Sequence, residues 1–157
     1  MEYLKSNIPI CLKVKVYHQC IEPAITYDCQ TLAITKRMQE RLRTMQRSME
    51  CSMIGVTKRD YKTNMWVRQT SKVHNIMEHV KTLKWRWAGH VARMNDNKWT
   101  KLVTEWLPIG YTRERARPKT RWIDEIRKFI GTTWTREAID RENWRNHGEA
   151  FVLQWTD

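Results

Sequence analysis

Glycine and proline are scarce in this sequence, with 5 Gly and 4 Pro among 157 residues. Both are frequent in the turns that an all-β protein needs between its short strands, so their scarcity argues against that class. Long hydrophobic runs are also missing, because no stretch of about 18 apolar residues is present that could cross a bilayer as a helix. No signal peptide is recognisable. We therefore expect an intracellular protein, nuclear or cytoplasmic, that has no membrane partner.

Cysteine is nearly as scarce, and its spacing is not that of a metal site. Cys11, Cys20 and Cys29 follow one another at nine-residue steps, and Cys51 comes later without a C-x-x-C pair. This spacing fits no common zinc pattern, although His18 lies near Cys20. We expect buried or incidental thiols, no metal ligands and no cofactor.

Acidic residues are too few to balance the basic ones, since 29 Lys and Arg stand against 17 Asp and Glu, a net charge of +12. The excess lies in two blocks. Residues 36–72 hold 10 basic and 3 acidic groups, net +7, and residues 81–128 hold 13 and 5, net +8. The rest of the chain is neutral or negative. A field of this kind attracts a polyanion, and nucleic acid is the commonest one.

The apolar residues are spaced as in helices. Hydrophobic residues make up 41 % of the chain, enough for a folded core, and most recur at three- and four-residue steps. This pattern predicts helices at residues 10–21, 36–54, 71–94, 99–106 and 118–130, and a last helical region from Thr133 or Thr135 to a break near Gly148. A strand is the alternative for 99–106. Residues 24–34 fit a helix or a strand, and a short helix is expected to start near Asp60. The expected fold class is all-α, a small helical bundle.

Two apolar stripes are the candidate core. The long helix 36–54 carries Met38, Leu42, Met45, Met49 and Met53 on one side and is expected to end at Gly55. The next helix, with Ser71 as its expected N-cap, carries a stripe that runs from Val73 through Trp87 to Met94. A polar stretch, 58–70, separates them. We therefore expect a helical segment at 1–57, a linker at 58–70 and a basic helical module at 71–157.

The stretch from Leu83 to Trp122 combines tryptophan with arginine at high density. Indole provides apolar area and a stacking face, and arginine provides fixed charge and a planar fork. Together they suit a phosphate backbone and its bases, although tryptophans in a core beneath a solvated basic face would give the same pattern. Trp87 and Trp122 are expected to be buried. The candidate nucleic-acid contacts are Lys84, Arg86, His90, Arg93, Arg113, Arg115, Arg117, Lys119 and Arg121.

The same stretch carries a motif. It reads Trp85-x-Trp87-Ala88-Gly89-His90-Val91-Ala92-Arg93-Met94, then Glu105-Trp106, then Arg115-x-Arg117-Pro118-x-x-Arg121-Trp122. In order and spacing it resembles the C-terminal end of non-LTR (LINE-type) retrotransposon proteins, the fused endonuclease–reverse transcriptases. Three further segments are similar to that family: Pro23-x-x-Thr26-Tyr27, Gln46-Arg47-x-Met49-x-x-x-Met53-x-Gly55, and Ala138-x-Asp140-Arg141-x-x-Trp144-Arg145. The resemblance implies a thumb-like N-terminal part followed by a basic C-terminal module.

The chain also departs from the family pattern. Asp28 stands where the family has Gly, Gln30 where it has Glu, Leu32 where it has Trp, and Ala116 where it has the Gly of an R-G-R-P segment. In an R-G-R-P hook the glycine lets the backbone enter the minor groove. Ala116 disfavours that use and leaves a loop that grips phosphate. The departures are typical of a diverged copy.

Catalytic residues of the family are not recognisable here. Its polymerase needs a palm aspartate pair for metal ions, and no two Asp are adjacent in this chain. No acidic and histidine set for the endonuclease is present either. We expect no enzyme activity from this chain alone. The resemblance implies a fragment that binds template RNA or target DNA during target-primed reverse transcription, with the upstream palm and endonuclease domains as candidate partners. A helical bundle that only braces the polymerase and a remnant without function are the alternatives.

Overall fold

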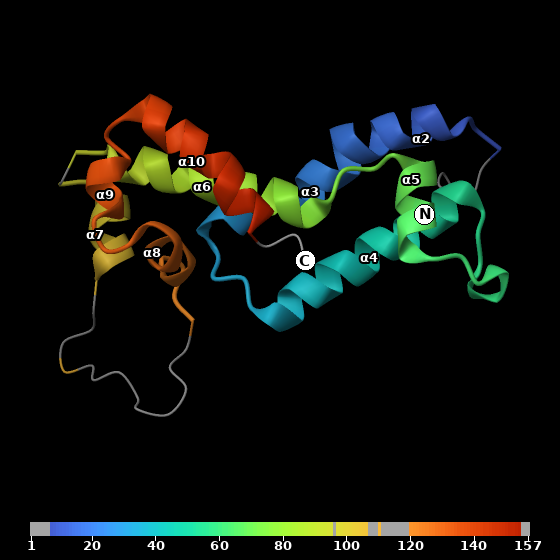
Figure 1. The fold of residues 1–157 in the computed structure, drawn as a ribbon, viewed down its shortest axis with the longest axis horizontal. Helices are drawn as coiled ribbons and strands as arrows, with labels where there is room; N and C mark the ends of the chain where they lie inside the picture. Colours follow the sequence, from blue (N-terminus) through green and yellow to red (C-terminus); the bar gives the residue numbers. More distant parts are fainter. Residues whose placement is uncertain (1–6, 96, 107–109, 111–119, 155–157) are drawn as a thin grey trace. The chain divides into compact units, whose positions relative to one another are not determined.

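The computed structural model describes residues 7–95, 97–106, 110 and 120–154, and within them it is helical without a strand (Figure 1). The all-α prediction is confirmed. The α-helices are α2 (Ile10–Val16), α3 (Glu22–Thr26), α4 (Lys36–Ile54), α5 (Asn64–Ser71), α6 (Ile76–Ala92), α7 (Trp99–Glu105), α8 (Asp124–Ile130), α9 (Trp134–Glu137) and α10 (Arg141–Leu153). A π-helical turn, Tyr17–Ile21, joins α2 to α3, and 3₁₀ turns lie at Cys29–Thr31 and Lys58–Asp60.

The helices pack into two compact units. Unit 1 comprises residues 1–27 and 36–79, and unit 2 comprises residues 28–35 and 80–157. The division falls inside α6, whose first residues belong to unit 1. The stretch 58–70, expected as a linker, lies within unit 1, where it forms a 3₁₀ turn and most of α5.

Unit 1 is organised by α4, which has the predicted bounds and ends at Gly55 with φ 79°. The predicted methionine stripe is only partly correct. Met53 is buried, but the other buried residues of α4 are the polar Gln46 and Glu50. The Gln46 amide explains this burial. Its Nε2 donates to the carbonyl of His74 at 2.6 Å, and its Oε1 accepts from the backbone N–H of Ile76 at 3.0 Å. A polar side chain thus anchors the start of α6.

The helix starts predicted at Asp60 and Ser71 were wrong. Asp60 instead forms a capping box with Thr57. The backbone N–H of Thr57 donates to Oδ2 of Asp60 at 2.7 Å. α5 begins at Asn64, where Thr63 Oγ1 accepts from the Trp66 N–H. Ser71 ends α5, and α6 starts five residues later. Polar residues with several possible capping roles therefore mark a boundary without fixing its direction.

Asp28 explains one departure from the retrotransposon pattern. Its φ of 60° places it in the left-handed region, which glycine adopts without strain and aspartate tolerates. The family's Gly at this position therefore suits the turn better than the residue present here. The adjoining stretch, which the sequence left open between helix and strand, is α3, this turn and the 3₁₀ turn that follows it.

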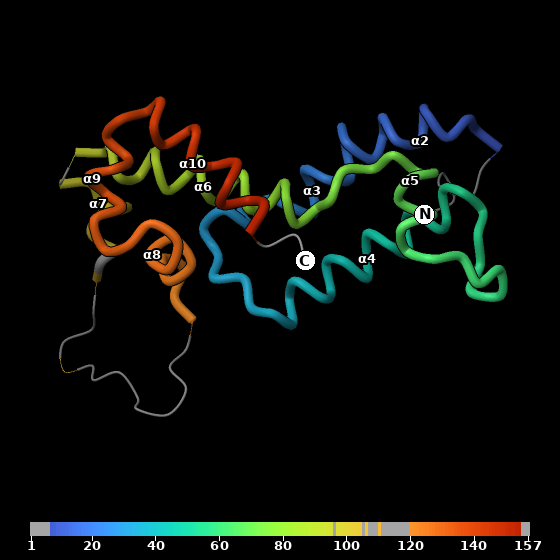
Figure 2. Tube along the Cα trace, in the orientation of Figure 1, coloured from blue at the N-terminus to red at the C-terminus, as the bar shows by residue number. Residues whose placement is uncertain are grey.

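Unit 2 is built on α6 and α10, which run antiparallel and side by side, as the trace in Figure 2 shows. The indoles of Trp85 and Trp144 stack with centroids 3.9 Å apart and an interplanar angle of 9°. Each ring N–H donates to the backbone carbonyl of the other tryptophan, at 2.8 Å from Trp85 and 3.1 Å from Trp144. Stacking and hydrogen bonding therefore use the same pair of side chains, so neither indole N–H is left unpaired.

Glycine makes this close approach possible on both helices. Gly89 lies one turn after Trp85, and a Cβ added there would lie 2.5 Å from Nε1 of Trp144. Gly148 lies one turn after Trp144, and its added Cβ would lie 2.9 Å from Cδ1 of Trp85. The two W-x-x-x-G segments thus fit each other reciprocally. The break predicted at Gly148 is absent, because α10 continues to Leu153 with this glycine as a packing site.

The remaining core of unit 2 surrounds this pair. The buried apolar residues of the cluster are Trp85, Ala88, Ala92, Ile123, Ile126, Trp134, Ala138, Trp144 and Phe151. Trp87 and Trp122, which we expected to be buried, are only half-buried. The reason is the rotation of α6: Trp85 faces the core, and Trp87, two residues on, lies about 200° further round the helix.

α7 and α8 differ from expectation in separate ways. α7 is the predicted helix, but its apolar side chains Trp99, Leu102 and Val103 are exposed. Pro118, the predicted start of the next helix, lies outside the described residues. α8 begins at Asp124, whose carboxylate accepts from the Arg121 backbone N–H at 2.8 Å.

We expect Gly89→Ala to lower the free energy of unfolding by about 1–3 kcal/mol, the usual cost of inserting a methyl group into a filled core. Helix propensity alone would raise it by up to about 1 kcal/mol, so the two causes predict opposite signs. Urea titration of the full chain measures the change. In a Trp144→Phe background the smaller ring leaves room for the added methyl group, so Gly89→Ala should lower the free energy of unfolding by less. Stabilisation by Gly89→Ala in the wild-type background would contradict the packing described.

Candidate nucleic-acid interface

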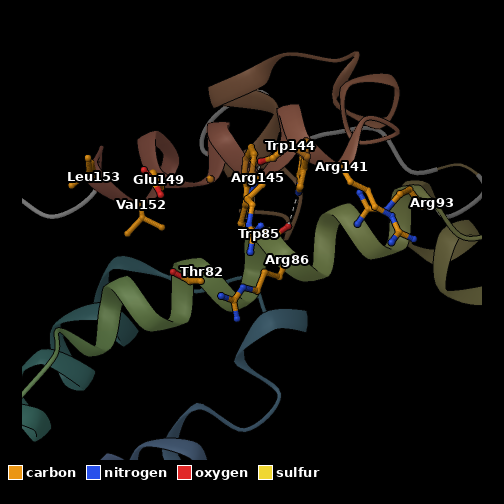
Figure 3. Close-up of a pocket in the computed structure, with 11 residues that line it drawn as sticks. Thr82, Trp85, Arg86, Arg93, Arg141, Trp144, Arg145, Glu149, Val152 and Leu153 are labelled. Atoms are coloured by element: carbon orange, nitrogen blue, oxygen red, sulfur yellow. Dashed lines mark hydrogen bonds between the residues drawn. The ribbon is translucent and has the colours of Figure 1, made fainter.

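A groove of about 760 Å³ lies between α6 and α10 on the outer side of the tryptophan pair (Figure 3). Four arginines and one carboxylate, that of Glu149, are among its lining residues. The arginines are Arg86 on α6, Arg93 directly after the end of α6, and Arg141 and Arg145 on α10. Four fixed positive charges against one negative charge make the groove cationic.

Helical spacing places these arginines. Arg86 lies on α6, and Arg93 directly follows the last residue of that helix, while Arg141 and Arg145 are one turn apart on α10. α10 begins where it does because the Asp140 side chain accepts from the N–H groups of Glu142 and Asn143. This N-cap fixes the first turn of α10, and with it Arg141.

Arg93 and Arg141 are like charges held close together, and Figure 3 shows their guanidinium groups side by side. Arg93 Nη1 donates to the backbone carbonyl of Ala138, which holds the side chain across the groove. Burial lowers the pKa of Arg93, and the charge of Arg141 lowers it further. A guanidinium group nevertheless keeps its charge at neutral pH. An anion between them would relieve their repulsion.

The groove is suited to phosphate. A guanidinium fork donates two parallel hydrogen bonds to an oxyanion, and several forks along one groove can follow a chain of phosphates. The lining also includes Trp85 and Trp144, which give the groove an apolar floor. Among the described residues no group of three His, Cys, Asp or Glu is placed to hold a metal ion.

Lys84, predicted to contact nucleic acid, is buried and belongs to an ion cluster instead. Its Nζ lies 2.8 Å from Glu125 Oε2, and Nζ of Lys81 lies 2.9 Å from the same oxygen. All three side chains lie in the interior of unit 2. Lys84 is therefore withdrawn from the candidate contacts, because a phosphate cannot reach it without breaking this cluster.

The cluster holds two ammonium groups for one carboxylate. Burial lowers the pKa of Lys84, and the attraction of Glu125 partly offsets that effect. Burial alone would raise the pKa of Glu125, but Lys84 and Lys81 together outweigh it and lower that pKa. The carboxylate is thus held ionised by the two ammonium groups beside it.

The other predicted contacts fall into three groups. Arg86 and His90 are exposed on α6, and Arg93 is half-buried at the groove. Arg121 is half-buried and borders a separate hollow between α7 and the start of α8. Arg113, Arg115, Arg117 and Lys119 lie outside the described residues.

Arg141 and Arg145 were not predicted as contacts, although both lie in the closing segment that resembles the retrotransposon family. Their one-turn spacing within a predicted helical region was a usable signal. The net charge of the region conceals this signal, because residues 129–157 carry 3 basic and 5 acidic groups, net −2.

The chain is similar to one curated protein of Caenorhabditis elegans, named "Putative uncharacterized transposon-derived protein F52C9.6", with 34 % identity over 147 residues. The match covers 85 % of this chain and 52 % of the nematode protein, so the chain spans about half the length of that relative. No protein-family model matches the chain, and no solved structure is recognisably similar to it. Within the described part of the chain, every helix is too short or too polar to cross a membrane.

We expect Glu125→Gln to lower the free energy of unfolding at pH 7 by about 3–5 kcal/mol, because two buried lysines lose their counter-charge. A carboxylate whose pKa is lowered by folding contributes stability above its unfolded pKa, and this contribution is lost as pH falls through the folded value. The difference between wild type and variant should therefore shrink below about pH 4.5.

Urea titrations between pH 3 and pH 8, a range of about five units chosen to bracket the unfolded pKa, measure this difference. Glu149→Gln is the matched control, since Glu149 is exposed and its neutralisation should change stability by less than about 0.5 kcal/mol. Equal effects of the two substitutions at neutral pH would show that the cluster does not stabilise unit 2.

Proposed function

We propose that this chain derives from a mobile element and binds nucleic acid through the groove between α6 and α10. The observation that carries the proposal is the convergence of Arg86, Arg93, Arg141 and Arg145 on one groove that has a single lining carboxylate. The net charge of +12 supports it. The transposon-derived name of the nematode relative supports the origin.

In finer terms, we propose that the chain is the C-terminal part of an endonuclease–reverse transcriptase of the non-LTR type. It would grip template RNA or target DNA during target-primed reverse transcription, and the upstream palm and endonuclease domains would be its partners. The motif from Trp85 to Trp122 supports this assignment. Polymerase and nuclease chemistry would then belong to those upstream domains, and this chain would contribute binding.

The cations that line the groove are arginines, without a lysine among them. Guanidinium groups bind oxyanions in two-pronged fashion and keep their charge at any physiological pH. The interior of unit 2 instead uses lysines, Lys81 and Lys84, which are paired with Glu125. Within unit 2, the buried ion cluster thus uses lysine and the groove uses arginine.

We expect the purified chain to bind RNA and DNA oligonucleotides with little sequence preference and with steep salt dependence, because phosphate contacts provide the affinity. Replacing Arg141 and Arg145 together by Gln should weaken binding and reduce the slope of log K against log salt by up to about 2. Both residues are exposed, so the melting temperature should stay nearly unchanged. Fluorescence anisotropy at several salt concentrations measures the slope.

The matched control is the double substitution of Lys128 and Arg136 by Gln. These residues are exposed in the same unit and do not line the groove, and the loss of charge is equal. If both double variants reduce the slope equally, the groove is no preferred contact. If the wild-type chain binds no oligonucleotide at low salt, the chain only braces its upstream domains or has no function.

A further inference from the structure

Unit 2 has a second hollow, of about 620 Å³, that is bordered by four tryptophans. They are Trp87 on α6, Trp99 and Trp106 at the two ends of α7, and Trp122 before α8. Trp99 and Trp106 are 80 % and 65 % exposed. A folded chain normally covers indoles of this size, so a cluster of exposed ones marks a binding surface.

Two of the rings are held in place by their surroundings. The Trp122 ring N–H donates to the carbonyl of Gln30, and the ammonium group of Lys84 lies 5.8 Å from the centre of the Trp122 ring. Trp87 lies against the exposed ring of His90, with centroids 5.5 Å apart. Such rings lose little conformational freedom when a flat ligand stacks on them.

Charge favours a nucleic acid over a protein as the occupant. Arg121 is the charged residue in the lining of the hollow, which otherwise adds hydroxyl groups of Thr31, Thr100 and Thr104 to the aromatic surface. In the sequence, residues 81–128, the stretch that carries these four tryptophans, hold 13 basic and 5 acidic groups. An indole beside a basic, hydroxyl-lined wall suits a base that is joined to a phosphate backbone.

The hollow adjoins the arginine groove in sequence and along α6. Arg86 lines the groove and Trp87, the next residue, borders the hollow. Successive residues of a helix point about 100° apart, so the two surfaces meet on neighbouring sides of α6. A strand that crosses α6 can place its phosphates on one surface and its bases on the other.

We propose that the tryptophan-lined hollow is a stacking site for unpaired nucleobases, so that the chain prefers single-stranded to fully duplex nucleic acid. The inference rests on the proposed nucleic-acid function and extends it from the backbone to the bases. Bases inside a duplex are already stacked on each other and cannot lie on Trp99 or Trp106 without being unstacked. Every base has a flat face, so the site reads no sequence.

The test uses the full chain and three fluorescent DNA probes of about 20 nucleotides, long enough to exceed a typical single-stranded site. They are a single strand, its duplex, and a single strand whose residues all lack bases. The Trp99→Ala/Trp106→Ala variant should bind the base-bearing strand about tenfold or more weakly than wild type. Its affinity for the abasic strand and its salt slope should be unchanged. Leu102→Ala/Ile139→Ala is the control, because both residues are exposed in unit 2 and neither lines the hollow.

The outcomes separate this inference from the proposed function. Equal binding of base-bearing and abasic strands by the wild type overturns the stacking site and leaves the phosphate groove intact. No binding of any probe overturns both. If the Trp99→Ala/Trp106→Ala variant changes the oligomeric state measured by sedimentation but not the affinity for DNA, a second copy of the chain covers the hollow and the inference is wrong.

Discussion

The reciprocal contact between Trp85 and Trp144 is the interaction on which unit 2 depends. Each indole N–H is paired with the carbonyl of the other residue, and the rings stack at 3.9 Å. This geometry requires a glycine one turn later on each helix and sets the register of the antiparallel pair. The register in turn places Arg93, which directly follows the end of α6, beside Arg141. The cationic groove is therefore a consequence of how the tryptophans pack.

A second constraint lies in the buried cluster of Lys81, Lys84 and Glu125. It joins α6 to α8 through a carboxylate that two ammonium groups share. Replacing all members of such a cluster by apolar residues often leaves the free energy of unfolding unchanged, whereas removing one member lowers it strongly. The cluster therefore determines which helices pair more than it adds to stability. Because the charges fit only when Glu125 faces α6, the cluster orients α8 and holds Ile126 in the core.

How much of this could be predicted from the sequence depends on the kind of signal. Repeated apolar spacing predicted the all-α class and both ends of α4. The same spacing predicted the wrong side of α6 as the side that faces the core. Trp85 and Trp87 are equally apolar, and it is the space at Gly148 on α10 that lets Trp85 be the buried one. The break predicted at Gly148 was wrong because helix propensity is a local property. It does not report that the Trp85 ring, which is distant in the sequence, packs against this glycine. At the candidate site, Arg86 and Arg93 were predicted, but Lys84 was assigned to the surface by its charge alone.

Four consecutive residues of α6 show how closely the elements of unit 2 are interlocked. Lys84 joins the buried ion cluster, Trp85 stacks in the core, Arg86 lines the groove and Trp87 borders the tryptophan-lined hollow. Each step of about 100° around the helix presents the next side chain to a different environment. A shift of one residue in the sequence of α6 would bury Arg86 and expose Trp85. Such a shift would destabilise the unit, because it buries an unpaired charge and removes the stacked pair from the core. The alternation of tryptophan with basic residues is therefore fixed by packing, and the same alternation gives the surface its charge and its stacking faces.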